Sequence, residues 1–225
     1  MPEPGWRREA AGACGALARR HGWKLLLLFV GVLLPMWAFL ELADEVHEAE
    51  AIPFDAPLLH VAQSVAGERL DRLSVFVSAL GYGWGVVPVD IALVLVLLAL
   101  RRWRQGLFAA VATGGSGLLN LAAKRLFARE RPALWESVAP ESTWSFPSGH
   151  AMGSMTLALV LVLLAWPTRA RWWVVAAMVA FVPMVGLSRV YLGVHYPSDI
   201  LAGWAAASIW VTGAWWLVMR NGRES

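Results

Sequence analysis

Long apolar runs separated by short charged segments dominate this sequence. Each run approaches or reaches the length of about 17–25 residues with which an α-helix crosses a bilayer. The pattern therefore predicts an all-α, polytopic membrane protein with six transmembrane helices. The predicted spans are Leu25–Leu40, Gly83–Leu100, Gly106–Ala123, Ala151–Trp166, Trp172–Leu187 and Ser198–Met219.

Residues 41–82 follow a different pattern. They carry eight acidic side chains, and apolar residues recur at helical spacing between Asp55 and Leu80. No uncharged stretch here reaches the roughly 20 residues that a span requires. We expect short amphipathic helices that lie along the outer membrane face and are broken near Gly67.

The composition agrees with a membrane protein. Hydrophobic residues make up 58% of the 225 positions and charged residues 16%, with a mean hydropathy of +0.56, whereas soluble domains are about a quarter charged. Fourteen tryptophans fit two membrane interfaces, where indole rings accumulate. The net charge of +3 gives no indication of nucleic-acid binding. We expect one membrane domain over residues 1–225, with a basic arm at 1–23, the outer-face segment at 41–82 and a core at 106–219.

The N-terminal part contains two further features. The basic arm and first apolar run resemble a signal peptide, but no small-residue cleavage site follows Leu40, so an uncleaved span is predicted. Pro35 should kink this span. Cys14 is the one cysteine of the sequence, which excludes an intramolecular disulfide and a cysteine-based zinc site. We expect it to be a free thiol.

The distribution of basic residues predicts the orientation. With six spans, twelve of the nineteen Lys and Arg residues lie on the side of the two termini. By the positive-inside rule this side is cytoplasmic. The acidic segment and the loops at 124–150 and 188–197 would then share the periplasmic or extracellular face of the cell (inner) membrane.

These two outer loops contain residues suited to phosphate chemistry. Three of their cations, two of them guanidiniums that bind oxyanions bidentately, suit a tetrahedral anion such as phosphate. Backbone N–H groups at a helix N-terminus after Ser148 would add to this cradle. The residues brought together are Lys124, Arg131, Ser148, Gly149, His150, Ser188, Arg189, His195 and Asp199.

Two histidines in these loops predict separate roles. Asp199 lies four residues after His195, so its carboxylate can accept from one imidazole nitrogen and leave the other as a nucleophile. His150 is then free to donate a proton to the leaving oxygen. Together with the cations, this arrangement predicts phosphoryl transfer through a covalent phosphohistidine.

Simpler interpretations remain open for several of these residues. Taken alone, Lys124 and Arg125 are anchors that flank a span, and His150 and His195 are turn or interface residues. A metal site formed by the two histidines and Asp199 is conceivable, although the nearby cations would oppose a divalent ion. No metal or cofactor is therefore expected.

Four other charged residues are expected to lie outside the site. Arg129, like Arg125, is interpreted as charge at the membrane edge, with Glu130 as its counter-charge. Asp90 lies within the second span, where an ionisable residue hints at function. However, Asp90 is only about two turns from the start of that run, so snorkelling toward an interface or pairing within the bundle explains it at least as well.

The three motifs resemble those of the type 2 phosphatidic acid phosphatase family. The family pattern is intact and in order over about the last half of the chain, as Lys124-x6-Arg131-Pro132, Pro147-Ser148-Gly149-His150 and Ser188-Arg189-x5-His195-x3-Asp199. The resemblance implies a six-helix core and metal-independent dephosphorylation of a lipid phosphate. It also implies that Lys124, Arg131, Ser148, Gly149 and Arg189 bind phosphate. His195 would be the nucleophile, Asp199 would orient it and His150 would be the general acid.

The motifs leave the substrate open. Phosphatidate, phosphatidylglycerophosphate and undecaprenyl diphosphate share the phosphate that these residues would bind. A lipid phosphotransferase, in which an alcohol replaces water as acceptor, is the main alternative. Vanadium haloperoxidases have a similar site but are soluble. A non-enzymatic lipid-phosphate binder or transporter would not need two histidines and an aspartate. The sequence does not predict the oligomeric state.

Overall fold

A computed structural model describes residues 22, 26 and 28–220 of the chain. The predicted basic arm (apart from Gly22), Cys14, the start of the first apolar run and the end of the polar tail lie outside these residues. Across the described part the secondary structure is helical, without strands, which confirms the all-α class. The elements are η1 (Phe29–Leu33), α2 (Leu34–His47), α3 (Asp55–Ser64), α4 (Glu68–Leu80), α5 (Val86–Ala99), α6 (Trp103–Phe127), α7 (Gly149–Ala165), α8 (Arg171–Tyr191) and α9 (Pro197–Arg220).

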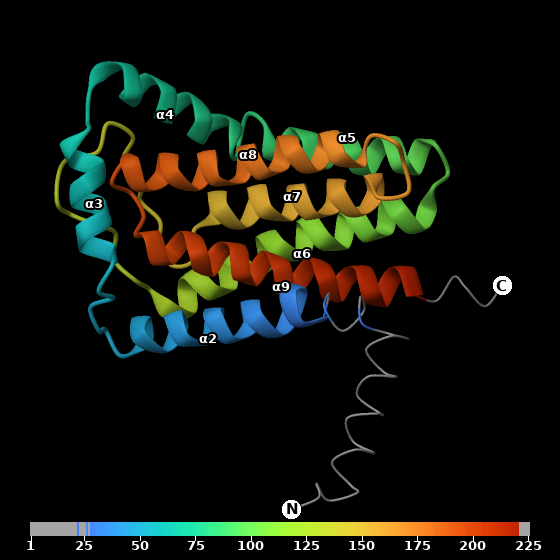
Figure 1. Ribbon diagram of the computed structural model, residues 1–225, viewed down its shortest axis with the longest axis horizontal. Coiled ribbons are helices and arrows are strands. Elements are labelled where there is room, and N and C mark those ends of the chain that lie inside the picture. The colour runs from blue at the N-terminus through green and yellow to red at the C-terminus, as the bar shows by residue number, and fades with distance from the viewer. Residues whose placement is uncertain (1–21, 23–25, 27, 221–225) are drawn as a thin grey trace, which may run out of the picture.

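The helices form a bundle with α7 and α9 at its centre. Helix α7 packs against α6, α8 and α9, and α9 also packs against α2 and α6. Figure 1 shows α2 and α5 to α9 running along the long axis, while α3 crosses one end of the bundle. Phe108, Val160 and Val211, from α6, α7 and α9, are fully buried in one apolar cluster. The connection between α6 and α7 and the connection between α8 and α9 both lie at the end of the bundle that α3 crosses (Figure 1).

Among the residues that the structure describes, three helices are long and apolar enough to cross a membrane, namely α6, α8 and α9, and α5 and α7 are shorter apolar helices. Many large apolar side chains point outward from the bundle, for example Leu126 and Trp173. An exposed apolar exterior of this extent fits contact with lipid. The chain is therefore an integral membrane protein.

The helix boundaries differ in places from the predicted runs. The third to sixth predicted spans match α6 to α9 closely, but the second is narrowed to α5, which begins after Gly85. A π-helical turn, η1, precedes α2 and its Pro35, with the Leu34 N–H donating to the Phe29 carbonyl. Proline removes one helix donor, and a widened turn is one way in which a helix accommodates such a change.

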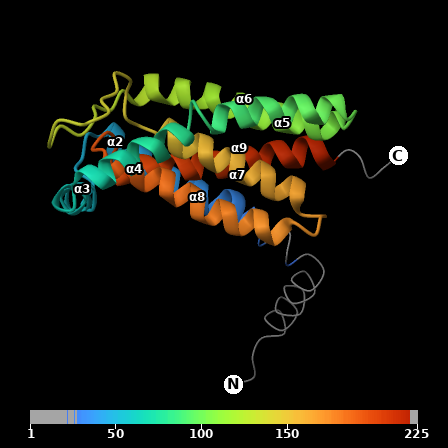
Figure 2. The same ribbon diagram turned by 90° about the horizontal axis from the view of Figure 1, so that it is seen from above.

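The amphipathic segment forms the predicted pair of short helices, broken at Gly67. Helix α4 packs along α8 (Figure 2). The Tyr191 hydroxyl donates to Asp71 Oδ1 at 2.7 Å and accepts from the Gly67 N–H at 3.0 Å. The acidic residues Glu41, Asp44 and Glu45 belong to α2 instead, because this helix continues to His47.

The starts of α7 and α9 are held together through the main chain. The Ser148 N–H donates to the Asp199 carbonyl at 3.0 Å. Gly203 permits this approach, because a Cβ at that position would lie 2.9 Å from the Ser148 carbonyl oxygen. The last residue before α7 and the first turn of α9 therefore lie side by side.

Candidate active site

The sequence-predicted site residues come from four helix ends and two connections. Lys124 lies in the last turn of α6 and Arg189 in the last turn of α8, whereas His150 and Asp199 lie in the first turns of α7 and α9. Arg131 and His195 lie in the connections between helices. Hydrogen bonds and ion pairs join residues of the first and third motifs at this end of the bundle.

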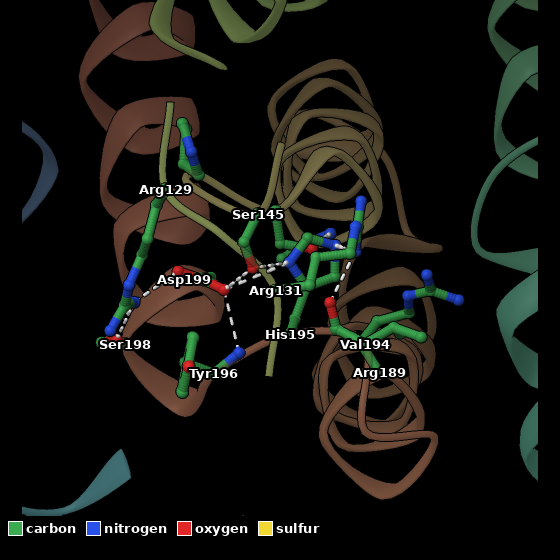
Figure 3. Close-up of polar contacts among 12 residues, drawn as sticks. Arg129, Arg131, Ser145, Arg189, Val194, His195, Tyr196, Ser198 and Asp199 are labelled. Atoms are coloured by element: carbon green, nitrogen blue, oxygen red, sulfur yellow. Dashed lines mark hydrogen bonds and ion pairs between the residues drawn. The ribbon is translucent and has the colours of Figure 1, made fainter. Parts of the chain in front are cut away.

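The centre of the site is a buried pair formed by His195 and Asp199. His195 Nδ1 lies 3.2 Å from Asp199 Oδ2, and the two residues are 1% and 0% exposed. The same carboxylate oxygen accepts from Ser145 Oγ at 2.5 Å and from the Tyr196 N–H at 2.8 Å (Figure 3). A carboxylate at Nδ1 favours the tautomer that carries its proton there. Nε2 is then unprotonated, and its lone pair accepts a hydrogen bond from Arg131 Nη1.

The environment of His195 keeps its ring neutral. Burial lowers the pKa of His195 to about 4, although the hydrogen bond and charge of Asp199 act in the opposite direction. Nε2 faces the first motif, since it lies 3.1 Å from Arg131 Nη1. At neutral pH the imidazole therefore presents a neutral Nε2 to a group held by Arg131.

Arg131 and Arg189 form a cationic cradle around one carboxylate. Arg131 Nη2 donates to Glu141 Oε2 at 2.7 Å, and Arg189 Nη2 donates to Glu141 Oε1. Arg131 is also fixed by the carbonyls of Thr143, at 2.6 Å, and Val194, at 2.5 Å. Both guanidiniums are therefore oriented toward a shared oxyanion position.

Glu141 occupies that position, and the sequence reasoning missed it. Burial favours its neutral form, but the Arg189 and Arg131 guanidiniums outweigh burial and lower the pKa of Glu141. Its ionised carboxylate offers two oxygens to the cradle, as a phosphate group would. No signal in the sequence singled it out, because Glu136 is a second acid in the same loop.

Lys124 lies at the edge of the cradle. Its Nζ donates to Thr143 Oγ1 at 3.3 Å and to the Trp144 carbonyl. Thr143 Oγ1 also accepts from Arg131 Nη2 at 3.0 Å. The ammonium group is thus linked to the cradle through the loop, without an ion pair of its own among the described residues.

The second motif forms the start of α7. Ser148 is buried and caps this helix, with its Oγ accepting from the Ala151 N–H at 3.5 Å. His150 Nδ1 lies 3.9 Å from Glu141 Oε1, and the His150 ring stacks on Tyr82 with centroids 5.0 Å apart. His150 therefore lies beside the carboxylate that bridges the two guanidiniums. Gly149 is the first residue of α7, where its N–H faces no helical acceptor.

Ser188 does not join the cradle through any hydrogen bond in the described structure. Its Oγ donates to the Val185 carbonyl at 2.7 Å, within its own helix. It is buried, so its role here is local to α8.

The interpretation of Arg129 as a membrane-edge charge is wrong. Arg129 Nη1 donates to Asp199 Oδ1 at 2.6 Å, and Nη2 donates to Asp55 Oδ2 at 2.8 Å. The guanidinium stacks on the Tyr196 ring at 4.0 Å. Its counter-charges are Asp199 and Asp55 rather than Glu130, because the chain turns inward at Ala128, which is left-handed with φ 43°.

Asp55 is a second residue that the sequence reasoning missed. It is buried at the start of α3 and accepts from the Ser198 N–H at 2.9 Å and from Ser198 Oγ at 2.5 Å. Asp55, Arg129 and Asp199 therefore form a continuous ionic chain that joins the amphipathic segment to the catalytic pair.

The described side chains do not form a conventional metal site. Within the part of the chain that the structure covers, no three His, Cys, Asp or Glu residues are grouped so that they could hold a metal ion. The nitrogen of His195 that faces away from Asp199 lies beside the Arg131 guanidinium instead, a group that suits an anion.

Comparison with known proteins identifies the family. Residues 105–223 match the family model described as the PAP2 superfamily. This chain belongs to the PAP2 superfamily. Within it, the chain is 30% identical over 202 residues to the undecaprenyl-diphosphatase of Sulfolobus acidocaldarius, covering 87% of this chain and 90% of the relative. It is 34% identical over 157 residues to the decaprenylphosphoryl-5-phosphoribose phosphatase of Mycobacterium tuberculosis, covering 66% and 84%.

A solved PAP2 structure shares the fold. It is the transmembrane PAP2-type phosphatidylglycerolphosphate phosphatase from Bacillus subtilis, with a TM-score of 0.75 and 23% sequence identity. The match covers 86% of this chain and 98% of that chain. The resemblance seen in the three sequence motifs is thereby confirmed at the level of the family and of the fold.

Proposed function

We propose that this protein is a membrane lipid phosphatase that cleaves a phosphate ester or diphosphate bond through a phosphohistidine on His195. The observation that carries the proposal is the buried His195–Asp199 pair beside the cradle of Arg131 and Arg189. This pair supplies a neutral nucleophilic nitrogen next to a site built for an oxyanion. The PAP2 relatives bear the names of lipid phosphatases.

The proposed mechanism has two steps. The substrate phosphate displaces the Glu141 carboxylate from the cradle, and His195 Nε2 attacks phosphorus. The bond to the leaving oxygen breaks, and His150 donates a proton to that oxygen. Water then attacks phosphorus, His150 takes up the proton, and the phosphorus–nitrogen bond breaks. Phosphate leaves and His195 is restored.

The phosphate-binding roles follow from the same geometry. Arg131 and Arg189 would hold two phosphate oxygens and Lys124 a third, while Ser148 and Gly149 would contribute at the start of α7. The positive charges of Arg131, Arg189 and Lys124 would stabilise the transition state without a metal ion. Activity in the presence of EDTA is therefore expected.

The substrate is a lipid whose phosphate reaches the edge of the bilayer. The named activities of the relatives support an undecaprenyl diphosphate, a polyprenyl phosphosugar or a phosphatidylglycerophosphate. All three offer a terminal phosphate to the same cradle. Phosphatidate shares this feature and belongs to the same test panel.

We also propose six membrane spans, with both termini in the cytoplasm and the site on the outer face. The distribution of basic residues supports this orientation. An accessibility tag at Ala139, in the loop before α7, tests it. Labelling from the periplasmic or extracellular side is expected, and labelling from the cytoplasm alone would reverse the orientation.

The decisive experiment measures phosphate release from detergent-solubilised protein in EDTA. His195→Ala should abolish release while the melting temperature stays near that of the wild type. His60→Ala is the matched control, because this histidine is exposed on α3. Undiminished release in His195→Ala would refute the nucleophile assignment, and wild-type activity that disappears with EDTA would refute the metal-free mechanism.

The same assay separates the phosphotransferase alternative. If an added alcohol or sugar takes up the phosphate in place of water, the protein is a phosphotransferase. Such an enzyme shares the phosphohistidine intermediate with a phosphatase and differs from it only in the final acceptor. A lipid-phosphate binder without activity would release no phosphate from any substrate.

A further inference from the structure

A cavity lined by both polar and apolar residues lies between α5, α6 and α7, beside the start of α7. Its volume is about 110 Å³, several times what one water molecule needs. Along α7 it reaches from Gly149 to Thr156, which is about two turns or 10 Å of helix. We call this cavity the polar chamber. Its polar lining residues include Asp90, Thr113, Ser116, Asn120 and Thr156.

Asp90 is the unsatisfied group of the polar chamber. Its Oδ1 is buried and accepts no hydrogen bond from any residue that the structure describes. Ser116 and Thr156, by contrast, bond to each other at 2.8 Å. Thr113 Oγ1 donates to the Ala109 carbonyl at 3.0 Å. A buried carboxylate oxygen without a donor is unfavourable, so this wall is complementary to a ligand that brings a hydroxyl group.

The polar chamber adjoins the catalytic residues. Tyr82 lines it and stacks on His150, and Gly149 is the residue directly before His150. Asn120 lines it as well, and its Nδ2 donates to the Pro147 carbonyl at 3.1 Å. Lys124 lies one turn of α6 beyond Asn120. A phosphate in the cradle would therefore have its leaving group at the end of the chamber nearest His150.

We propose that the polar chamber binds a hydroxylated alcohol, such as a glycerol or sugar unit, that carries the substrate phosphate. In this site Asp90 accepts a hydrogen bond from a free hydroxyl next to the scissile bond. The proposal rests on the proposed phosphatase function and specifies its substrate class. It favours lipid phosphates with a polyol between phosphate and lipid over those that lack a free hydroxyl there.

The test compares two substrates in detergent. Phosphatidylglycerophosphate carries its terminal phosphate on a glycerol with a free hydroxyl, whereas phosphatidate has no free hydroxyl beside its phosphate. Leaving a buried polar group without its hydrogen-bond partner corresponds to a factor of about ten to a hundred. We therefore expect Asp90→Leu to lower kcat/KM for phosphatidylglycerophosphate by about that factor and to leave phosphatidate within about twofold.

Two further variants keep the test decisive. Asp90→Asn retains the side-chain size and an acceptor oxygen without the charge, so its loss should be smaller but equally selective. It serves in place of Asp90→Leu if the leucine variant does not fold. Asp44→Asn is the matched control, because Asp44 is an exposed carboxylate on α2, and it should change neither substrate.

The outcomes are distinct. An equal loss on both substrates, or no loss on phosphatidylglycerophosphate, in a variant with a wild-type melting temperature would overturn the role of the polar chamber. If the wild type hydrolyses neither lipid nor undecaprenyl diphosphate, the proposed function itself fails, and the chamber assignment fails with it. That result is visible before any variant is made.

Discussion

Replacing Arg129 tests whether the ionic chain behind the active site holds Asp199 in place. Arg129 bridges Asp55 and Asp199 through bonds of 2.8 and 2.6 Å, and these carboxylates are 4% and 0% exposed. Arg129→Met preserves much of the side-chain length but removes the positive charge and all five donors. The variant therefore leaves two buried carboxylates facing one another without a counter-charge.

The size of the effect follows from this burial. Breaking a buried ion pair by removing one partner costs about 3–5 kcal/mol, since the remaining charge stays buried and unpaired. In a chain of this length each kcal/mol lowers the melting temperature by roughly 2–4 °C. We expect Arg129→Met to melt roughly 6–20 °C below the wild type. Its kcat should also fall, because Asp199 loses one of the groups that orient it.

The assay is thermal unfolding in detergent, combined with phosphate release at a temperature where all variants are folded. Arg125→Met is the matched control, because Arg125 is an exposed cation four residues earlier, and surface substitutions usually change stability by about 0.5 kcal/mol or less. Asp55→Asn in the Arg129→Met background should recover part of the lost stability by removing one unpaired charge. Equal melting temperatures for Arg129→Met and Arg125→Met would refute the reasoning.

The remaining predictions concern three residues in and around the site: His195, Glu141 and Gly193. Burial lowers the pKa of His195 from 6.5 to about 4. Protonation of His195 should therefore reduce kcat/KM only as the pH falls to about 4. A decrease in kcat/KM that His195 causes near pH 6.5 would contradict this. Between these two values the unfolded chain binds a proton that the folded chain does not, so the free energy of unfolding should decrease as the pH falls. Glu141→Gln removes the charge that competes with phosphate, so inhibition by inorganic phosphate or vanadate should strengthen by about tenfold, the scale of one charge-assisted hydrogen bond. Glu136→Gln is the control, because Glu136 is exposed in the same loop. Unchanged inhibition in Glu141→Gln would refute the competition between this carboxylate and phosphate. Gly193 has φ 68°, and a Cβ there would lie 2.6 Å from the Trp135 ring. Gly193→Ala should therefore lower the melting temperature by several degrees, as strain of about 1–3 kcal/mol implies. A wild-type melting curve for this variant would show that the loop adapts.

The sequence predicted those parts of the fold and site that depend on local spacing. The third to sixth apolar runs became helices α6 to α9 because hydrophobic length alone specifies a helix in a bilayer. The break at Gly67 also followed from local composition. The contact between His195 and Asp199 was also predictable from spacing, because Asp199 lies in the first turn of α9, only four residues after His195.

The missed features depend on contacts between residues far apart in the sequence. Asp55 meets Ser198 across 143 positions, and no periodicity in either segment indicates this contact. Arg129 resembled other cations next to a span, and only the fold shows its inward turn. Glu141 lay in a loop without helical or strand pattern, so its position between two guanidiniums was not visible in the sequence.

The main-chain bond between Ser148 and Asp199 has a consequence for how the protein can change its specificity. Ser148 precedes the proposed acid His150 by two residues, and Asp199 bonds to the proposed nucleophile His195. The main-chain bond therefore holds the backbone segments that carry the acid and the nucleophile together in one joint. Side-chain replacements elsewhere leave the joint intact. The loop that carries Glu141 and the walls of the polar chamber can therefore be redesigned for a new lipid, while the chemical step remains the same.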